Sequence, residues 1–165
     1  MTRPTTPTSG PNTTDQDWVP AGPFRAYALH LADAAAVPWP VVAYQAGLPV
    51  ATLRTLIYGR NGKPRTKITR QTANQLLNLT TADLSYLRVN QVEASGAGAR
   101  IRILRGRNTA WDRIARYLRL DIRTCQAIAK GHKTACSVMV DILAHTACEI
   151  IGLNPWEILD APSYR

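Results

Sequence analysis

Hydrophobic positions recur in the same sparse pattern in two stretches of the chain, residues 39–59 and 111–131, which align without a gap 72 residues apart. Each stretch starts at a tryptophan and ends at a glycine, Gly59 in the first and Gly131 in the second. Apolar residues spaced three and four apart within each stretch predict two short helices joined by a tight turn. Because a repeated unit fixes the architecture, the pattern predicts two helix-turn-helix units in one chain.

The segments around the two stretches predict the helices that would support them. A helix is expected to begin at Pro23, which suits a first-turn position, and to stop before Val37-Pro38. Phe24 and Leu31 are spaced for one apolar face of that helix. The other helices expected in the first unit are residues 40–47, residues 50–58 and a helix capped by Thr69. In the second unit the expected helices are residues 100–104, a helix starting near Thr109 and Asp112, and a helix capped by Asp121.

The repeat is expected to resume beyond Gly131 after a small change in loop length. Leu76 would then align with Ile150, and Leu79 with Leu153, at a distance of 74 residues. The predicted fold is therefore all-α, with two tandem helix-turn-helix domains and a disordered N-terminal tail rich in threonine and proline. The expected boundaries are a tail at 1–17, a first domain at 18–87, a linker at 88–97 and a second domain at 98–165.

The 165-residue chain has a formal net charge of +9 and a sequence pI near 10.0. Such a charge indicates an acidic partner, either a nucleic acid or an anionic membrane surface. No apolar run approaches the roughly 20 residues that span a bilayer, and the N-terminus lacks the apolar stretch of a secretory signal. We therefore expect a cytoplasmic, nucleoid-associated protein whose partner is double-stranded DNA, with no membrane partner.

The residue types that support catalysis are scattered along the chain. The three histidines form no cluster, the acidic residues occur singly, and no phosphate-binding glycine loop is present, so no enzymatic activity is expected. Three cysteines cannot all pair within one chain, and without a CxxC spacing they indicate reduced, packed thiols. A zinc site built from Cys125, His132 and Cys136 is an alternative, but no metal or cofactor is part of the prediction.

Small and apolar residues occupy the positions that a helix-turn-helix requires. Ala43 and Ala115 lie where the two helices of each unit would cross closely. Gly47 lies in the turn of the first unit, and Arg119 takes its place in the second. A positive φ at this arginine would introduce modest strain.

Two further motifs follow the repeated helices: residues 59–64, Gly-Arg-Asn-Gly-Lys-Pro, and residues 151–159, Ile-Gly-Leu-Asn-Pro-Trp-Glu-Ile-Leu. Over residues 21–160 the chain resembles the lambda-repressor/Cro-like helix-turn-helix regulators of actinobacteria and their phages. In that family a Gly-basic-x-x-Pro loop follows the recognition helix, and Leu-Gly-x-x-Pro-x-x-Leu closes the domain. The resemblance implies two lambda-repressor-like domains, each with its third helix in the major groove of DNA.

The resemblance also implies which side chains would contact DNA. Outward residues of each third helix would contact base edges, with Arg123 suited to guanine and Gln126 to adenine. The basic loop, residues 60–67, would contact phosphates or reach into a neighbouring minor groove. A second basic cluster at 100–107 is either a solvated face or a further binding surface. The implied DNA-binding residues are Ala51, Thr52, Arg54, Thr55, Tyr58, Arg60, Lys63, Arg65 and Lys67 in the first unit, and Asp121, Arg123, Thr124, Gln126, Lys130 and Lys133 in the second.

Together these features predict a sequence-specific double-stranded DNA-binding transcriptional regulator, a repressor of the phage-immunity or bacterial type. The outward residues of the two units differ, so one chain is expected to bind an asymmetric site of two unlike halves about one helical turn apart. A linker of about ten residues would extend to at most about 33–36 Å, enough to reach successive major grooves. The alternatives are a protein-interaction adaptor or antitoxin, favoured by the weakly polar third helix of the first unit, and a DNA-bending accessory factor. Self-association also stays open.

Overall fold

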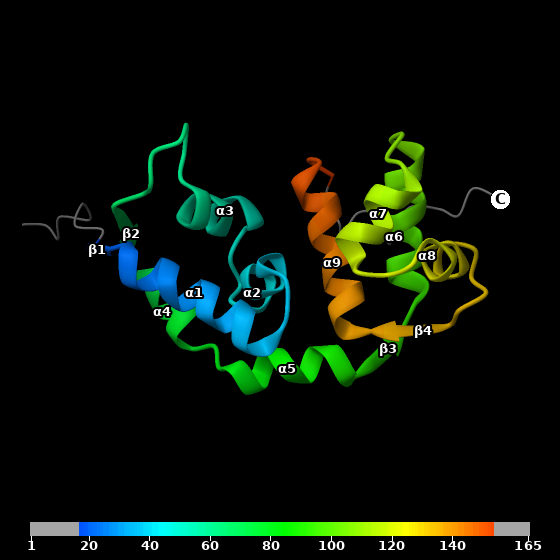
Figure 1. The fold of residues 1–165 in the computed structure, drawn as a ribbon, viewed down its shortest axis with the longest axis horizontal. Helices are drawn as coiled ribbons and strands as arrows, with labels where there is room; N and C mark the ends of the chain where they lie inside the picture. Colours follow the sequence, from blue (N-terminus) through cyan, green and yellow to red (C-terminus); the bar gives the residue numbers. More distant parts are fainter. Residues whose placement is uncertain (1–16, 154–165) are drawn as a thin grey trace, which may run out of the picture.

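A computed structural model describes residues 17–153 of the chain, so nearly all of the expected tail and residues 154–159 of the closing motif lie outside the described part. The described part is mostly helical, with two small antiparallel sheets (Figure 1). The first half contains β1 (Trp18–Pro20), α1 (Gly22–Ala35), α2 (Trp39–Gln45), α3 (Val50–Tyr58), β2 (Lys67–Thr69), α4 (Arg70–Leu77) and α5 (Thr81–Val89). The second contains β3 (Gln91–Glu93), α6 (Ser95–Gly106), α7 (Trp111–Leu118), α8 (Ile122–Ala129), β4 (Ala135–Ser137) and α9 (Val138–Ile150).

The expectation of an all-α fold is wrong at the four short strands. β1 pairs with β2, where Val19 lies opposite Ile68, and β3 pairs with β4, where Val92 lies opposite Cys136. Strands of three residues are too short for an alternating pattern to stand out in the sequence. Each sheet joins the chain before the first helix of its half to the chain before that half's fourth helix.

The order strand, three helices, strand, helix occurs in both halves, and the turns between the helices match as well. In three pairs of residues, both members have a positive φ and are separated by 72 positions, which is the offset of the sequence repeat. Arg119 has a positive φ of 55°, so the modest strain considered for it applies, and the equivalent Gly47 has 72°. The three pairs are Ala36 and Asn108, Gly47 and Arg119, and Gly59 and Gly131.

The alignment expected beyond Gly131 is wrong in its register. The caps of α4 and α9 are Thr69 and Ser137, and the side chain of each accepts the backbone N–H three residues further on. These caps are 68 residues apart, not 74, so the second half has the shorter loop. An alignment based only on apolar positions allowed the wrong register, because α9 has buried residues at seven of its positions and so is apolar on nearly every side.

The expected linker at 88–97 is wrong, because these residues belong to the end of α5, to β3 and to the start of α6. Ala94 and Ala97 are fully buried, so the segment is part of the core. Gly98 follows directly, and a Cβ there would lie 2.7 Å from the carbonyl oxygen of Ile128. The small residues of this segment therefore allow α6 to approach α8 closely. Because these residues are small, the segment shows no spacing of large apolar residues.

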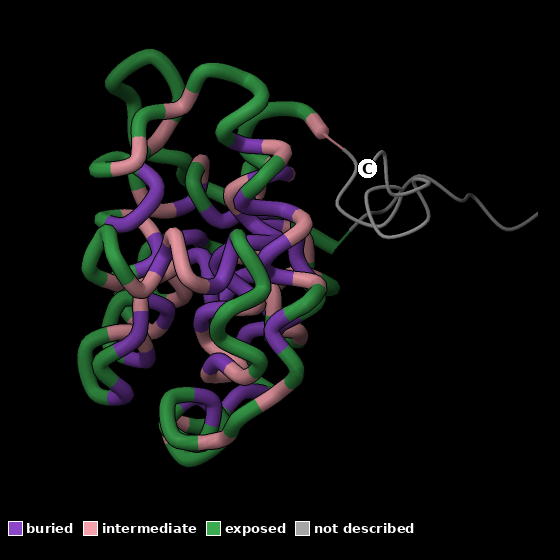
Figure 2. The backbone as a smooth tube through the Cα atoms, turned by 90° about the vertical axis from the view of Figure 1, so that its right-hand side faces the viewer, coloured by how far each residue is buried: buried purple, intermediate pink, exposed green. Residues whose placement is uncertain are grey.

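Helix α9 packs against both halves of the described chain, because it contacts α2, α3 and α5 as well as α6 and α7. The ring of His145 on α9 meets the ring of Tyr44 on α2 edge to face, with centroids 4.9 Å apart. Figure 2 shows the buried segments gathered along the centre of the molecule and the exposed turns around them. The two halves thus share one hydrophobic core, and α9 fixes their relative position.

Candidate nucleic-acid interface

The loop after α3 begins with a tight hairpin turn. The backbones of Arg60 and Lys63 exchange two hydrogen bonds, of 3.0 and 3.1 Å. Asn61 and Gly62 between them both have positive φ, 52° and 73°, which is the geometry of a type I′ turn and explains the Asn-Gly pair. A Cβ on Gly59 would lie 2.2 Å from the Lys63 carbonyl oxygen, so the hairpin requires glycine there. The turn holds Arg60 and Lys63 side by side at its two ends.

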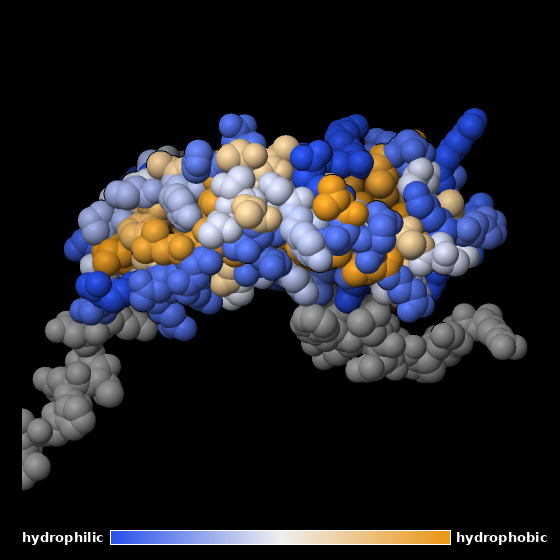
Figure 3. Space-filling model, turned by 90° about the horizontal axis from the view of Figure 1, so that it is seen from below, coloured by the Kyte–Doolittle hydropathy of each residue, from blue (hydrophilic) through white to orange (hydrophobic). Residues whose placement is uncertain are grey.

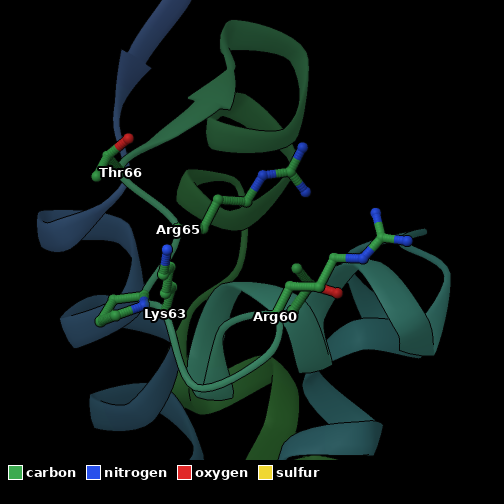
Figure 4. A pocket seen from close by; sticks show the side chains of 6 residues that line it. Arg60, Lys63, Arg65 and Thr66 are labelled. Atoms are coloured by element: carbon green, nitrogen blue, oxygen red, sulfur yellow. The ribbon is translucent and has the colours of Figure 1, made fainter.

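The loop and α3 enclose an open cleft of about 640 Å³. Arg60 and Arg65 extend their charged ends to the same side of the loop, and Lys63 lies on the limb between them (Figure 4). Arg25 on α1 donates from Nε to the carbonyl of Leu56 and from Nη2 to that of Arg65, both at 2.7 Å, and so ties the loop to α1. The cleft is lined by Thr55, Arg60, Lys63, Pro64, Arg65 and Thr66.

The charge around this cleft is of one sign. No acidic residue occurs between Asp33 and Asp83, whereas six arginines and lysines do. One of these six, Arg70, pairs with Asp17 at 3.0 Å. The remaining five are exposed and form no ion pair with another described residue, so their fields add to an attractive surface for polyanions. We call these five, Arg54, Arg60, Lys63, Arg65 and Lys67, the basic surface.

The outer face of α3 continues the basic surface. Ala51 and Arg54 are exposed, and Tyr58 is 62% exposed with its ring edge against Trp39. Thr55 is half-buried and donates its hydroxyl to the carbonyl of Ala51 within the helix. Thr52 is half-buried and lines, together with Arg65, a smaller cleft between α3 and the start of α4.

In the second half the expected residues of α8 divide into capping and exposed groups. The Asp121 carboxylate accepts both the backbone N–H and the hydroxyl of Thr124, each at 2.7 Å, and these hydrogen bonds lower the pKa of Asp121. Both residues are thus engaged in starting the helix. Gln126 is half-buried, and besides the capping Asp121 the exposed predicted residues are Arg123, Lys130 and Lys133.

Ile122 was not expected from the sequence to be a site residue, yet it is 42% exposed at the first position of α8 beside Arg123. Its counterpart in the repeat, Val50, is buried at 2% because α9 covers the start of α3. In protein–DNA complexes, exposed apolar side chains contact thymine methyl groups. The sequence feature that could have identified Ile122 as a site residue is its position directly after the Asp121 cap.

The second basic cluster is largely structural. Arg100 is buried and pairs with Asp141 at 3.2 Å, and Arg102 donates to the carbonyl of Ala129 at 2.7 Å. Arg105 donates to the carbonyl of Thr109 and lies 5.0 Å from the ring centre of Trp111. These contacts join α6 to its neighbours, although within the described part of the chain only Arg100 is neutralised by an ion pair and Arg102, Arg105 and Arg107 remain exposed.

The three cysteines are free, buried thiols, as expected, and burial raises the pKa of each to about 11. His132 is exposed while Cys125 and Cys136 are in the core. Among residues 17–153 no group of three metal-ligating side chains occurs. No helix in the same range is long and apolar enough to cross a bilayer.

A separate exposed apolar surface lies on α4 and α5. Leu77, Tyr86 and Val89 are 56%, 64% and 73% exposed. Seen from below, where α5 lies, the molecule shows hydrophobic patches interrupted by hydrophilic residues (Figure 3). This side faces away from α3 and its loop (Figure 1), so a ligand on the basic surface would leave α5 uncovered.

Comparison with known proteins found no matching family model, no matching curated protein and no matching solved structure.

Proposed function

We propose that this protein is a sequence-specific double-stranded DNA-binding transcriptional regulator with two lambda-repressor-like helix-turn-helix units, α2–α3 and α7–α8. The observation that carries the proposal is the basic surface, which places five cations with no ion-pair partner among the described residues around the exposed face of a short helix that follows a tight turn. A duplex supplies a regular row of phosphates for the loop and base edges for the helix.

The two helices would have different tasks in base recognition. On α3 the exposed Ala51 and Arg54 face outward, so this helix offers one small apolar contact and one guanine-binding side chain. On α8 the exposed Ile122 and Arg123 stand at the start of the helix, the part that meets base edges in helix-turn-helix complexes. Unlike faces favour an asymmetric site bound by one chain.

Because α9 packs on both halves, the spacing between the two half-sites is set by packing and not by a flexible linker. Insertion of a few base pairs between the halves would therefore turn one half-site away from its helix and lose most of the specific affinity. Occupancy of such a site near a promoter would act as repression, and the protein would work at the nucleoid.

Selection from random duplexes at two salt concentrations tests the proposal. We expect an enriched asymmetric sequence, and an affinity that falls steeply with salt because phosphate contacts release counterions. The mass of the complex should correspond to one chain per site. An absence of duplex binding at 50–100 mM salt would contradict the proposal and favour a protein-binding role, and tight binding without an enriched sequence would favour a DNA-bending accessory factor.

A further inference from the structure

The first turn of α3 has no cap of its own. Its N-cap residue is Pro49, whose side chain accepts no hydrogen bond, whereas the equivalent residue of the second half is Asp121, whose carboxylate caps α8. Helix N-termini leave backbone N–H groups without partners, and a buried one is costly. Val50, the first residue of α3, is 2% exposed, so its N–H cannot depend on water.

The missing cap is supplied from the other half of the molecule. The backbone N–H of Val50 donates to Oε1 of Glu149 on α9 at 2.9 Å, across 99 positions of the sequence. A hydrogen bond to an ionised carboxylate is stronger than one between neutral groups, and negative charge is favourable at a helix N-terminus. Glu149 therefore stabilises the start of α3 as Asp121 stabilises the start of α8.

The surroundings of Glu149 hold its own helix in place. On α9 the buried Thr146 shares a hydrogen bond of 2.8 Å with the hydroxyl of Tyr117 on α7. The residue before it, His145, packs against Tyr44 on α2. The carboxylate thus sits on a helix that is fixed to both halves, and a shift of α9 would move the N-terminus of α3.

We propose that Glu149 is a positioning residue for base recognition by α3, so that the second half of the protein sets the specificity of the first. This inference rests on the proposed DNA-binding function. Glu149 itself need not touch DNA, since Ala51 and Arg54 on the exposed face of α3 would make the contacts.

Four variants test this role. Glu149→Ala removes the acceptor and the charge, and Glu149→Gln keeps an amide oxygen as acceptor but removes the charge. Glu93→Ala, at an exposed glutamate of β3, makes the same change in net charge and is the matched control. Adding Pro49→Asp to Glu149→Ala restores a cap of the kind found at Asp121, because Pro49 and Asp121 have similar backbone angles.

The first measurement needs no DNA. Amide hydrogen exchange in the free protein should speed up at Val50 by about tenfold or more in Glu149→Ala, because a hydrogen bond to a charged group is lost. The amide of Thr124, capped within its own half, should not change. Unchanged exchange at Val50 would overturn the inference.

The second measurement is selectivity on the selected duplex. We expect Glu149→Ala to lose about tenfold in discrimination against a duplex scrambled in the half that faces α3, with discrimination in the other half retained. The discrimination of Glu149→Gln should lie between those of the unaltered chain and Glu149→Ala. Pro49→Asp added to Glu149→Ala should recover the lost discrimination, and Glu93→Ala should match the unaltered chain. Equal losses in both halves, or no loss, would overturn the inference while the proposed function stands. If the unaltered chain bound no specific sequence, both the proposed function and the recognition role would be overturned.

Discussion

Replacement of Gly59 by alanine should destabilise the protein through one close backbone contact. Gly59 has φ 77° and ψ −175°, a conformation that is essentially restricted to glycine. An added Cβ would lie 2.2 Å from the carbonyl oxygen of Lys63 and 2.6 Å from its carbonyl carbon. This approach exists because Arg60 and Lys63 exchange two backbone hydrogen bonds, so relief of the clash requires the hairpin to open.

The size of the effect follows from two costs. The backbone conformation alone costs about 1–3 kcal/mol for a residue with a side chain. Overpacking against rigid atoms typically adds about 1–3 kcal/mol. We therefore expect the free energy of unfolding to fall by about 2–6 kcal/mol, and the midpoint of thermal unfolding by at least about 4 °C, since 1 kcal/mol shifts a domain of this size by about 2–4 °C.

Gly131→Ala is the matched control, because Gly131 is the equivalent residue in the repeat and has φ 76°. No atom lies within 4 Å of a Cβ built there, so this variant should lose only the cost of a left-handed residue, about 1–2 kcal/mol. Urea unfolding followed by circular dichroism measures both variants. Equal losses in the two proteins would refute the argument that the hairpin contact requires glycine.

Three further predictions concern the charges and the buried histidine. Replacing Lys63 and Arg65 together by alanine should flatten the slope of log affinity against log salt by about 1–2 units with little change in sequence preference, as measured by fluorescence anisotropy; an unchanged slope would remove them from the phosphate contacts. Arg123→Ala should cost about 1–3 kcal/mol at the selected site and relax selectivity at one or two base pairs, and an equal loss on random duplexes would make it a phosphate contact instead. His145 has its pKa lowered to about 4, chiefly by burial and also by the nearby Arg100. Because the folded-state pKa lies below the unfolded one, the contribution of His145 to stability is full above about pH 6.5 and is lost as the pH drops toward 4, by about 3 kcal/mol in total. His145→Phe should remove most of this loss in urea titrations at pH 5 to 6.5. An unchanged loss in that variant would assign the pH dependence to other groups.

The repeat was predictable because it depends on local features of the sequence. Apolar spacing marked the paired helices, and glycine marked two of the turns, so Gly59 and Gly131 aligned correctly from the sequence alone. The hairpin was also present in the sequence, since an Asn-Gly pair between two basic residues is a strong turn signal. The run of positive charge predicts a basic loop at residues 60–67 but not the hairpin turn within it.

Features that depend on contacts between distant segments could not be predicted. A strand of three residues has no period of its own, and β3 exists because its partner β4 lies beside it. The segment 88–97 resembled a linker since small residues bury little area, although Ala94 and Ala97 are core residues. No local pattern marks Glu149 as the partner of Val50, because the contact depends on how α9 packs between the halves.

Sequence-specific recognition by this protein is measured by the ratio of its affinities for the selected duplex and for a scrambled duplex of the same composition, determined by competition at about 150 mM salt. A sequence-specific regulator should bind the selected duplex about 10³-fold or more tightly, with one chain per site. Equal affinity for the two duplexes would rule out sequence-specific binding, because the exposed faces of α3 and α8 would then recognise no bases.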